Sequence, residues 1–428
     1  MGSDVGCDDA FEPPCAVSRS VVLEASPHIT ATPGVSVQRS LDGVVAVWHK
    51  RESLVADGGV GDASSDGGEP PNPTPAITSF EVALVDVDRI AVRSRRSIPA
   101  PSRLRERRNN LGAIGVVMEG DDTALLHWIE TSVTNDGLGR NLFGASLVLG
   151  YANADGTVRM LDAKPSMTCE RCAMAFAVVS LGVESLVFVR VDHQPLDVIM
   201  GATPTKPVFH VLRVRRDGTI LEEPAPWLTI DVEVGTEAAV IDAPPISAIL
   251  DAEGKILVTA DRRAWRVDAS PRLEEGPWTL PSAPDVKLVA RNSNMALGVW
   301  SIAPSTEGRG DDDTPREIFG GSFDGSTRAI RSRLTVGRTV LAMDGRGEDV
   351  GLLFESAARV FFTTIDSRTG EKRTDDLFVS AEEGVAASQR GFPDIRQDRA
   401  LIALGDGRFV AVTLGFGQLV ARELRCAR

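Results

Sequence analysis

Two of the five cysteines are spaced in a way that could support chemistry. Cys169 and Cys172 form a Cys-x-x-Cys pair, a spacing shared by zinc half-sites, redox-active pairs and small disulfide rings. A zinc site needs a second pair of ligands, and the sequence has no other Cys-x-x-Cys or His-x-x-x-His pair, although Cys7 and Cys15 could contribute. A thioredoxin-like pair precedes a helix, whereas Cys172 runs into an apolar segment typical of a buried strand. We therefore expect a structural disulfide between Cys169 and Cys172.

A second disulfide is expected to join the two ends of the chain. A bond from Cys426 to Cys15, or failing that to Cys7, would staple the termini together and would imply an oxidising compartment. One thiol would then remain free, most naturally that of Cys7. Val5 and Gly6 resemble the approach to the lipidated cysteine of bacterial lipoproteins, although Asp4 stands where that pattern has an apolar residue. Cys7 is thus a possible lipid anchor.

The histidines offer two candidate arrangements. His49 and His127 each lie beside a tryptophan in a matching place on an early strand, so they could line a channel, but strand alternation favours outward residues beside a core tryptophan. Asp192 and His193 could be half of a nucleophilic triad, yet no Gly-x-Ser-x-Gly motif provides the nucleophile. We assign no catalytic residues. The other two histidines are His28 and His210.

Two clusters of charge could bind ions or anionic partners. Asp311-Asp312-Asp313 lacks the alternating spacing that directs carboxylate oxygens at one calcium ion, so a solvated loop is expected and no metal site is assigned. The arginine cluster has no interleaved aromatic residues, which favours a solvated edge strand and linker over a surface for an anionic partner. The cluster comprises Arg93, Arg95, Arg96, Arg103, Arg105, Arg107 and Arg108.

The composition excludes several classes of partner. A formal net charge of -14 opposes attraction to nucleic acid or to anionic membranes. No apolar run is long enough to span a membrane, and the first twenty residues lack the apolar core of a signal peptide. The polar start of the sequence, with two cysteines, is what an exported protein without its signal would show. We expect a secreted, periplasmic or cell-surface monomer without a cofactor.

Short strands separated by a recurring turn dominate the sequence. The strands are rich in β-branched residues and are bounded by Gly, Asp, Asn and Pro. Between them an acidic residue followed by glycine recurs, and this pair supplies the positive φ angles of a tight hairpin. The repetition predicts a propeller or a solenoid. The turns are Asp42-Gly43, Asp155-Gly156, Asp217-Gly218, Glu253-Gly254, Asp324-Gly325 and Asp406-Gly407.

The turns divide the chain into seven units, which favour an all-β propeller of seven blades, with six or eight as alternatives. We expect residues 1–19 to be a polar N-terminal segment and 20–428 a single propeller domain. The strand near Ser20 would complete the last unit, and the Gly/Asp/Ser/Pro tract 57–75 would be a disordered insertion. A two-domain β-sandwich is the alternative fold. The units lie near residues 33–100, 111–165, 172–230, 238–280, 286–336, 338–380 and 391–426.

Three short stretches resemble known propeller repeats. Residues 364–372 resemble the strand-end turn of quinoprotein-type repeats, without the tryptophan that usually follows. Residues 317–324 are similar to the double-glycine strand of kelch repeats, and 322–327 approach the Asp-box of sialidases but are one residue short. These resemblances imply a shared hairpin geometry and transfer no activity.

The expected function is therefore non-enzymatic. We expect an exported or cell-envelope scaffold that binds a protein or small ligand through its loops or the mouth of its channel. The alternative is a carbohydrate-active hydrolase or lyase with a site at that mouth, which would need carboxylates or histidines converging in one pocket.

Overall fold

The computed structural model of the chain describes the strands and some of the connections between them. The described residues are 15–25, 35–40, 43–52, 76–100, 115–119, 123–135, 141–153, 157–170, 172–193, 207–222, 227–229, 246–250, 254–260, 263–279, 285–290, 296–302, 317–323, 332–335, 339–346, 349–356, 359–366, 372–381, 400–415 and 418–427.

The described strands pair into seven antiparallel sheets, which we number in chain order. Sheet 1 combines both ends of the chain, and the other six follow in sequence. From the centre outwards, sheet 1 holds β28 (Ala400–Gly405), β29 (Arg408–Gly415), β30 (Gln418–Cys426) and β1 (Cys15–Ala25). Sheet 2 holds β2 (Val35–Ser40), β3 (Gly43–Glu52), β4 (Ala76–Asp86) and β5 (Ala91–Pro99).

Sheets 3 and 4 have divided outer strands, each formed by two short pieces. Sheet 3 holds β6 (Gly115–Glu119), β7 (Thr123–Asn135) and β8 (Asn141–Ala152), and then β9 (Val158–Met160) and β10 (Thr168–Cys169), both paired with β8. Sheet 4 holds β11 (Cys172–Ser180), β12 (Glu184–His193) and β13 (Val208–Arg215), and then β14 (Ile220–Glu222) and β15 (Leu228–Thr229).

Sheets 5 to 7 each have four strands. Sheet 5 holds β16 (Ile246–Leu250), β17 (Ile256–Ala260), β18 (Arg263–Val267) and β19 (Leu273–Thr279). Sheet 6 holds β20 (Asp285–Ala290), β21 (Ala296–Ile302), β22 (Glu317–Phe323) and β23 (Ser332–Thr335). Sheet 7 holds β24 (Thr339–Arg346), β25 (Asp349–Ser356), β26 (Arg359–Asp366) and β27 (Leu377–Ala381).

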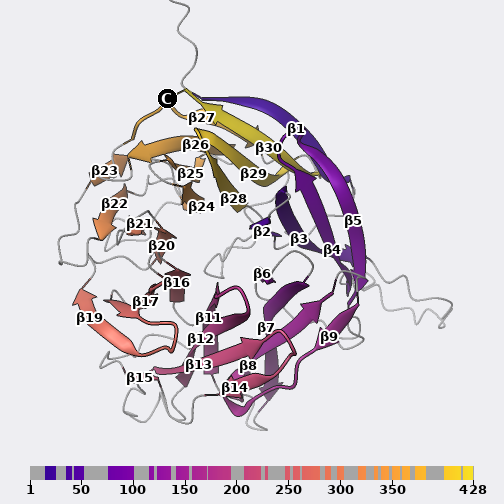
Figure 1. Cartoon of the computed structure of the whole chain (residues 1–428), viewed down its shortest axis with the longest axis vertical. Coiled ribbons are helices and arrows are strands. Elements are labelled where there is room, and N and C mark those ends of the chain that lie inside the picture. Colours follow the sequence, from indigo (N-terminus) through magenta and orange to yellow (C-terminus); the bar gives the residue numbers. More distant parts are fainter. Residues whose placement is uncertain are drawn as a thin grey trace, which may run out of the picture.

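The sheets form a closed ring around a central axis (Figure 1). The innermost strands β28, β2, β6, β11, β16, β20 and β24 contact one another in this order, and β24 contacts β28 again. The prediction of an all-β propeller is thus confirmed, and the two-domain sandwich is not supported. Among the described residues, no helix is long and apolar enough to cross a membrane.

Strand β1 completes sheet 1 by pairing antiparallel with β30. Cys15 lies opposite Cys426 in this ladder, and the two form a disulfide with their Cα atoms 3.9 Å apart. The strand begins at Cys15, so residues 15–19 of the expected polar N-terminal segment 1–19 belong to the propeller. The polar residues at its start are in a strand because they bind the neighbouring strand's side chains, as described below.

The connections at the two ends of the sheets differ in length. One end, the hairpin face, holds the turns from first to second and from third to fourth strand of each sheet. The other end, the loop face, holds the connections from second to third strand and from one sheet to the next. The six longest connections all lie on the loop face, and each is longer than the longest hairpin-face connection, 367–376. These six are residues 53–75, 100–114, 194–207, 230–245, 303–316 and 382–399.

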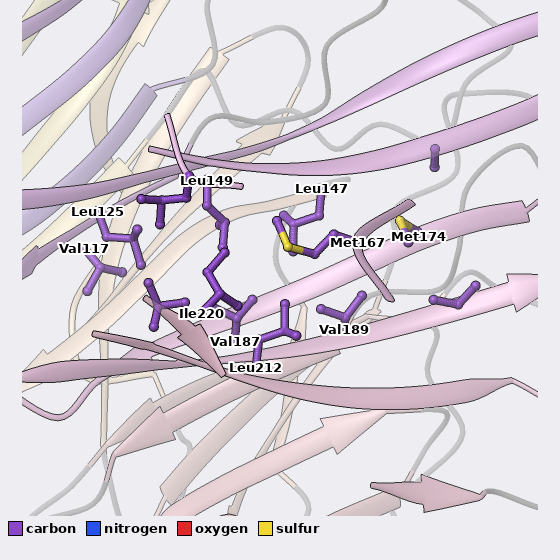
Figure 2. Packing of buried hydrophobic residues seen from close by; sticks show 14 of the residues in the cluster. Val117, Leu125, Leu147, Leu149, Met167, Met174, Val187, Val189, Leu212 and Ile220 are labelled. Atoms are coloured by element: carbon purple, nitrogen blue, oxygen red, sulfur yellow. The ribbon is translucent and has the colours of Figure 1, made fainter. Parts of the chain in front are cut away.

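The core consists of apolar clusters between neighbouring sheets. Between sheets 3 and 4, Leu125 and Leu149 pack with Val187 and Leu212, and all four are fully buried (Figure 2). Because each sheet is covered on both faces, central strands are apolar at successive positions instead of alternating. Burying one such side chain is worth about 1.5–3 kcal/mol relative to exposing it. This packing fixes the sheets and leaves the connections to differ between the two faces.

Candidate functional site

The turns of the hairpin face are held by aspartate side chains. Asp86 Oδ1 accepts hydrogen bonds from the backbone N–H groups of Asp88 and Arg89, at 2.8 and 3.0 Å. Asp217 Oδ1 accepts the N–H of Thr219 at 2.8 Å in the equivalent turn of sheet 4. These backbone hydrogen bonds hold the pKa values of both aspartates below their usual value. Aspartate side chains therefore hold the backbone of these two hairpin-face turns.

An arginine from one sheet repeatedly reaches a carbonyl in the turn of the next sheet, a contact that we call a latch. Arg159 Nη1 of β9 donates to Asp217 O at 2.9 Å, linking sheets 3 and 4. Hydrogen bonds to charged groups are stronger than neutral ones, so the latches oppose separation of the sheets at this face. The other latches are Arg19 to Asp88 O, Arg96 to Asn153 O at 3.4 Å, and Arg213 to Ala269 O at 3.3 Å.

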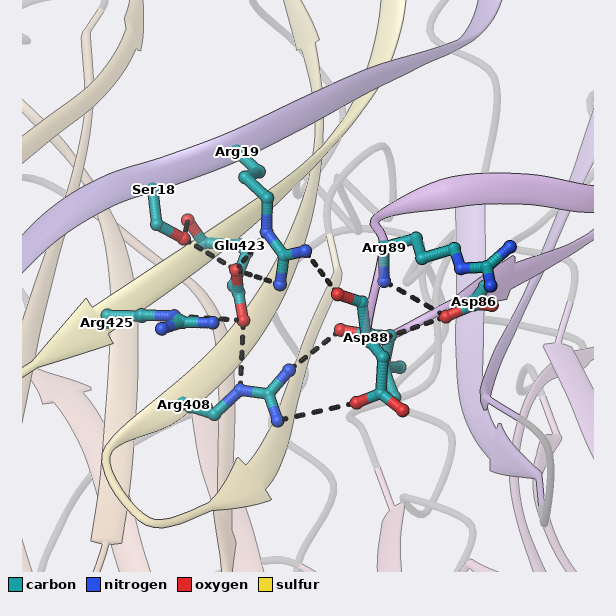
Figure 3. A network of polar contacts seen from close by, with 9 residues as sticks. Ser18, Arg19, Asp86, Asp88, Arg89, Arg408, Glu423 and Arg425 are labelled. Carbon is teal, nitrogen blue, oxygen red and sulfur yellow. Dashed lines mark hydrogen bonds and ion pairs between the residues drawn. The ribbon is translucent and has the colours of Figure 1, made fainter.

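Glu423 is the centre of the polar network that joins sheets 1 and 2 (Figure 3). Its fully buried carboxylate accepts hydrogen bonds from Ser18 Oγ at 2.6 Å and Arg19 Nε at 2.8 Å. It also forms ion pairs with Arg408 Nε at 2.9 Å and Arg425 Nε at 3.2 Å. Burial opposes ionisation, but these four donors outweigh it and lower the pKa of Glu423 to about 2.

Arg408 extends the Glu423 network to the neighbouring sheet. Its Nη2 donates to Val87 O at 2.8 Å in the β4–β5 turn, close to the latch from Arg19 to Asp88. Both ends of the chain are therefore tied to each other and to sheet 2 through one buried carboxylate. The network explains why the polar residues Ser18 and Arg19 lie within β1.

An ion pair joins three innermost strands near the hairpin face. Asp344 Oδ2 of β24 accepts Arg39 Nη2 of β2 at 2.9 Å and the N–H of Ala403 of β28 at 2.7 Å. Burial raises the pKa of Asp344, against the opposing effect of Arg39. The pair thus bridges the innermost strands of sheets 7, 1 and 2.

Two further buried carboxylates are paired with arginine. Asp192 Oδ1 accepts Arg190 Nε at 2.8 Å, and both side chains are buried. Glu81 accepts Arg95 Nε at 3.2 Å, and Arg95 also binds Glu24. Arg95 belongs to the arginine cluster predicted as a solvated edge. Arg93, Arg95 and Arg96 are all exposed on the outer strand β5, as predicted, whereas Arg103, Arg105, Arg107 and Arg108 lie outside the described residues.

His127 is buried between sheets 3 and 4, so its side chain neither lines a channel nor points outwards. It is 8 % exposed and packs against Phe176 of sheet 4, with ring centroids 5.0 Å apart. Burial lowers the pKa of His127 to about 3, so the imidazole is neutral near pH 7. The prediction of an outward position was wrong for His127, because in this ring neighbouring sheets cover both faces of β7.

The structure describes only some of the other candidate residues from the sequence. His193 is exposed at the end of β12, and His210 is partly exposed in β13. His28, Cys7, the tract 57–75 and the aspartates 311–313 lie outside the described residues, as does the side chain of His49. Within the described part of the chain, no three His, Cys, Asp or Glu side chains form a group that could hold a metal ion.

One loop-face connection, between β9 and β11, is described almost completely. Its 3-10 helix η1 (Pro165–Met167) buries Met167 in the core, and the Met167 N–H donates to Lys164 O at 2.9 Å. The short strand β10 follows, and Cys169 forms a disulfide with Cys172, with Cα atoms 5.9 Å apart. We call residues 164–170 the hook. It is anchored on the scaffold beside the start of the innermost strand β11.

The latches and the Glu423 network were missed in the sequence analysis. One sequence pattern could have indicated the latches. Arg19, Arg96 and Arg159 each lie on the outer part of a unit, and each is followed one unit later by an acidic turn. Pairing across units cannot be assigned from spacing alone, because the acceptors are backbone carbonyls present at every residue.

No protein-family model and no curated protein matches the chain. Solved structures similar to it include an arabinanase from Penicillium chrysogenum (12% identity, 97% of this chain and 99% of that chain, TM-score 0.46). Others are a virginiamycin B lyase from Staphylococcus aureus (10%, 96% and 100%, TM-score 0.44) and a fucose-binding lectin from Aleuria aurantia (10%, 83% and 98%, TM-score 0.41). That lectin is described as six-bladed, whereas the described strands of this chain pair into seven sheets. At these values the similarities transfer no activity.

Proposed function

We propose that this chain is a non-enzymatic scaffold, a single seven-bladed propeller domain that binds a protein or a small ligand at its loop face. The observation that carries the proposal is the difference between the two faces. The hairpin face is cross-linked by the latches and the Glu423 network. The loop face holds the six longest connections, and binding residues concentrate on loops that a rigid scaffold positions.

The state of the buried carboxylates favours a scaffold over a carbohydrate-active hydrolase or lyase. A glycoside hydrolase needs two carboxyl groups facing one substrate, one of them with a raised pKa. In the described part of the chain, the buried carboxylates of Glu81, Asp192 and Glu423 are each paired with arginine. Asp344, whose pKa is raised, is bound to Arg39 and to a backbone N–H. Each of these groups contributes to structure.

We also propose that the protein is exported and acts as a monomer in the cell envelope or outside the cell. Disulfides form and persist in oxidising compartments, and two join described residues. Because β1 starts at the hairpin face, a lipid anchor at Cys7 would hold that face towards the membrane and direct the loop face away from it.

The proposal is tested with a panel of soluble glycans and cell-envelope fractions. We expect no reducing ends to be released from any glycan, because no catalytic pair is proposed. A component that binds should slow hydrogen exchange in the loop-face connections and leave the hairpin turns unchanged. Turnover of any glycan, or protection confined to the hairpin face, contradicts the proposal.

Matched variants locate the binding surface. Replacing 57–75 by a short Gly-Ser linker should weaken binding, since it removes a loop-face connection. Val183→Ser is the control, because Val183 is 73% exposed at the tip of a hairpin-face turn. If only the Val183 variant loses binding, the binding surface lies on the hairpin face and the proposal is wrong.

A further inference from the structure

The two disulfides differ in what holds their cysteines together. Cys15 and Cys426 belong to a ladder of nine residue pairs, next to the Glu423 network. Cys169 belongs to β10, which pairs with β8 through only two residues. If both bonds were open, Cys15 and Cys426 would stay opposite each other, whereas Cys169 would be held by two residue pairs and the burial of Met167.

The Cys169–Cys172 disulfide also lies where an external thiol can reach it. Cys169 is partly exposed between the exposed residues Thr168 and Glu170, whereas Cys172 is 1% exposed at the start of β11. A thiol would therefore attack the sulfur of Cys169 and release Cys172 as the leaving thiolate. Cys172 lies opposite His193 in the β11–β12 ladder, and cross-strand partners share a face of the sheet.

We propose that Cys169–Cys172 is an exchangeable disulfide that a dithiol reduces while Cys15–Cys426 persists, and that its reduction releases the hook at the loop face. The attacking thiolate forms a mixed disulfide with Cys169, and Cys172 leaves and takes a proton. The second thiol of the reductant then displaces Cys169, which also takes a proton. The reductant leaves as a disulfide, so two electrons and two protons pass to the protein.

Release of the hook follows from its few remaining contacts. With the bond open, residues 164–170 keep the two-residue ladder of β10, the buried side chains of Ser166 and Met167, and the packing of Cys169 against the core cluster. Short ladders open locally at little cost, so the hook should exchange between bound and open states. The redox state of one bond would thus change the shape of the loop face without opening the ring.

The experiment equilibrates the folded protein in buffers of reduced and oxidised dithiothreitol, followed by alkylation and mass spectrometry. We expect Cys169 and Cys172 to be half-reduced at a reduced-to-oxidised ratio at least tenfold lower than Cys15 and Cys426. Hydrogen exchange at residues 166–170 should speed up at least tenfold in that state, while β30 stays unchanged. Equal or reversed order of reduction, or unchanged exchange in the hook, overturns the proposal.

Paired variants separate reduction from other effects of the reagent. Cys169→Ser with Cys172→Ser should reproduce the fast exchange of the hook without reductant. Cys15→Ser with Cys426→Ser should leave the hook's exchange and the reduction of Cys169–Cys172 unchanged. If the hook of the Cys169→Ser, Cys172→Ser variant remains fully protected from hydrogen exchange, the proposed release is wrong. None of these measurements depends on whether the protein binds a glycan.

Discussion

The hairpin face and the loop face are built from the same strands but are stabilised differently. At the hairpin face, aspartates bind turn N–H groups and arginines bind turn carbonyls of the next sheet. At the loop face, the hook is held by a short ladder, one buried methionine and a disulfide between residues three apart in sequence. One end of a closed ring can thus provide rigidity while the other provides the variable surface.

The largest effect on stability should come from the Cys15–Cys426 disulfide at the hairpin face. Replacing Cys15 and Cys426 by serine frees a loop of 411 residues, for which the chain-entropy model gives an upper value of about 6 kcal/mol in unfolding free energy. The same change at Cys169 and Cys172 should cost about 2 kcal/mol, because that loop is short. Denaturant unfolding of both double variants measures the difference.

Thiol counting checks the premise of this comparison. Denatured, non-reduced protein from an oxidising host should have one free cysteine, Cys7. Five free thiols would show that neither disulfide forms and would remove the argument for export. Equal losses of unfolding free energy in the two double variants would show that the Cys15–Cys426 disulfide has no special role.

The next effect should come from the carboxylate at the centre of the hairpin-face network. Glu423→Gln keeps the shape of the side chain but removes the buried charge that Arg19, Arg408 and Arg425 share, so we expect a loss of about 3 kcal/mol. The pKa of Glu423 is depressed from 4.5 to about 2, so its contribution is complete above pH 4.5 and is lost as pH falls towards 2. Urea unfolding at several pH values should give a shallower acid decline for the variant; an unchanged decline contradicts the assignment.

A single latch should contribute less. Arg159→Ala removes the hydrogen bond to Asp217 O, and we expect a loss of about 1 kcal/mol with faster hydrogen exchange in the turn 216–219. Glu170→Gln, at an exposed position of the loop face, is the control and should change stability by less than about 0.5 kcal/mol. If the two variants are equally stable, the latches do not distinguish the faces.

The smallest effect should come from the loop-face tract 57–75. Replacing it by a short linker should change the unfolding free energy by less than about 0.6 kcal/mol, since closure entropy depends weakly on loop length. Limited proteolysis of the unmodified chain should cut first within this tract. Initial cleavage elsewhere, with the tract intact, would refute its interpretation as a disordered insertion.

Much of the ring could be predicted from local sequence because its turns repeat. Asp217-Gly218 and Asp406-Gly407, the two pairs that the structure describes in full, lie in hairpin-face turns, and Gly407 shows why glycine is needed there. Its φ is +69°, and a Cβ at this position would lie 2.5 Å from Cys426 O. His127 was misplaced because alternation along one strand does not reveal that another sheet covers its second face.

The sequence by itself determined the strands, the hairpin turns and the all-β class, since these depend on residue types within a few positions of one another. Only the tertiary structure decided which carboxylates are bound by which arginines. Glu423 and Arg19 are distant in the sequence and adjacent in sheet 1, and Asp344 meets Arg39 across three sheets. Such pairs depend on how the ring closes, and ring closure is a property of the packed sheets that no local pattern encodes.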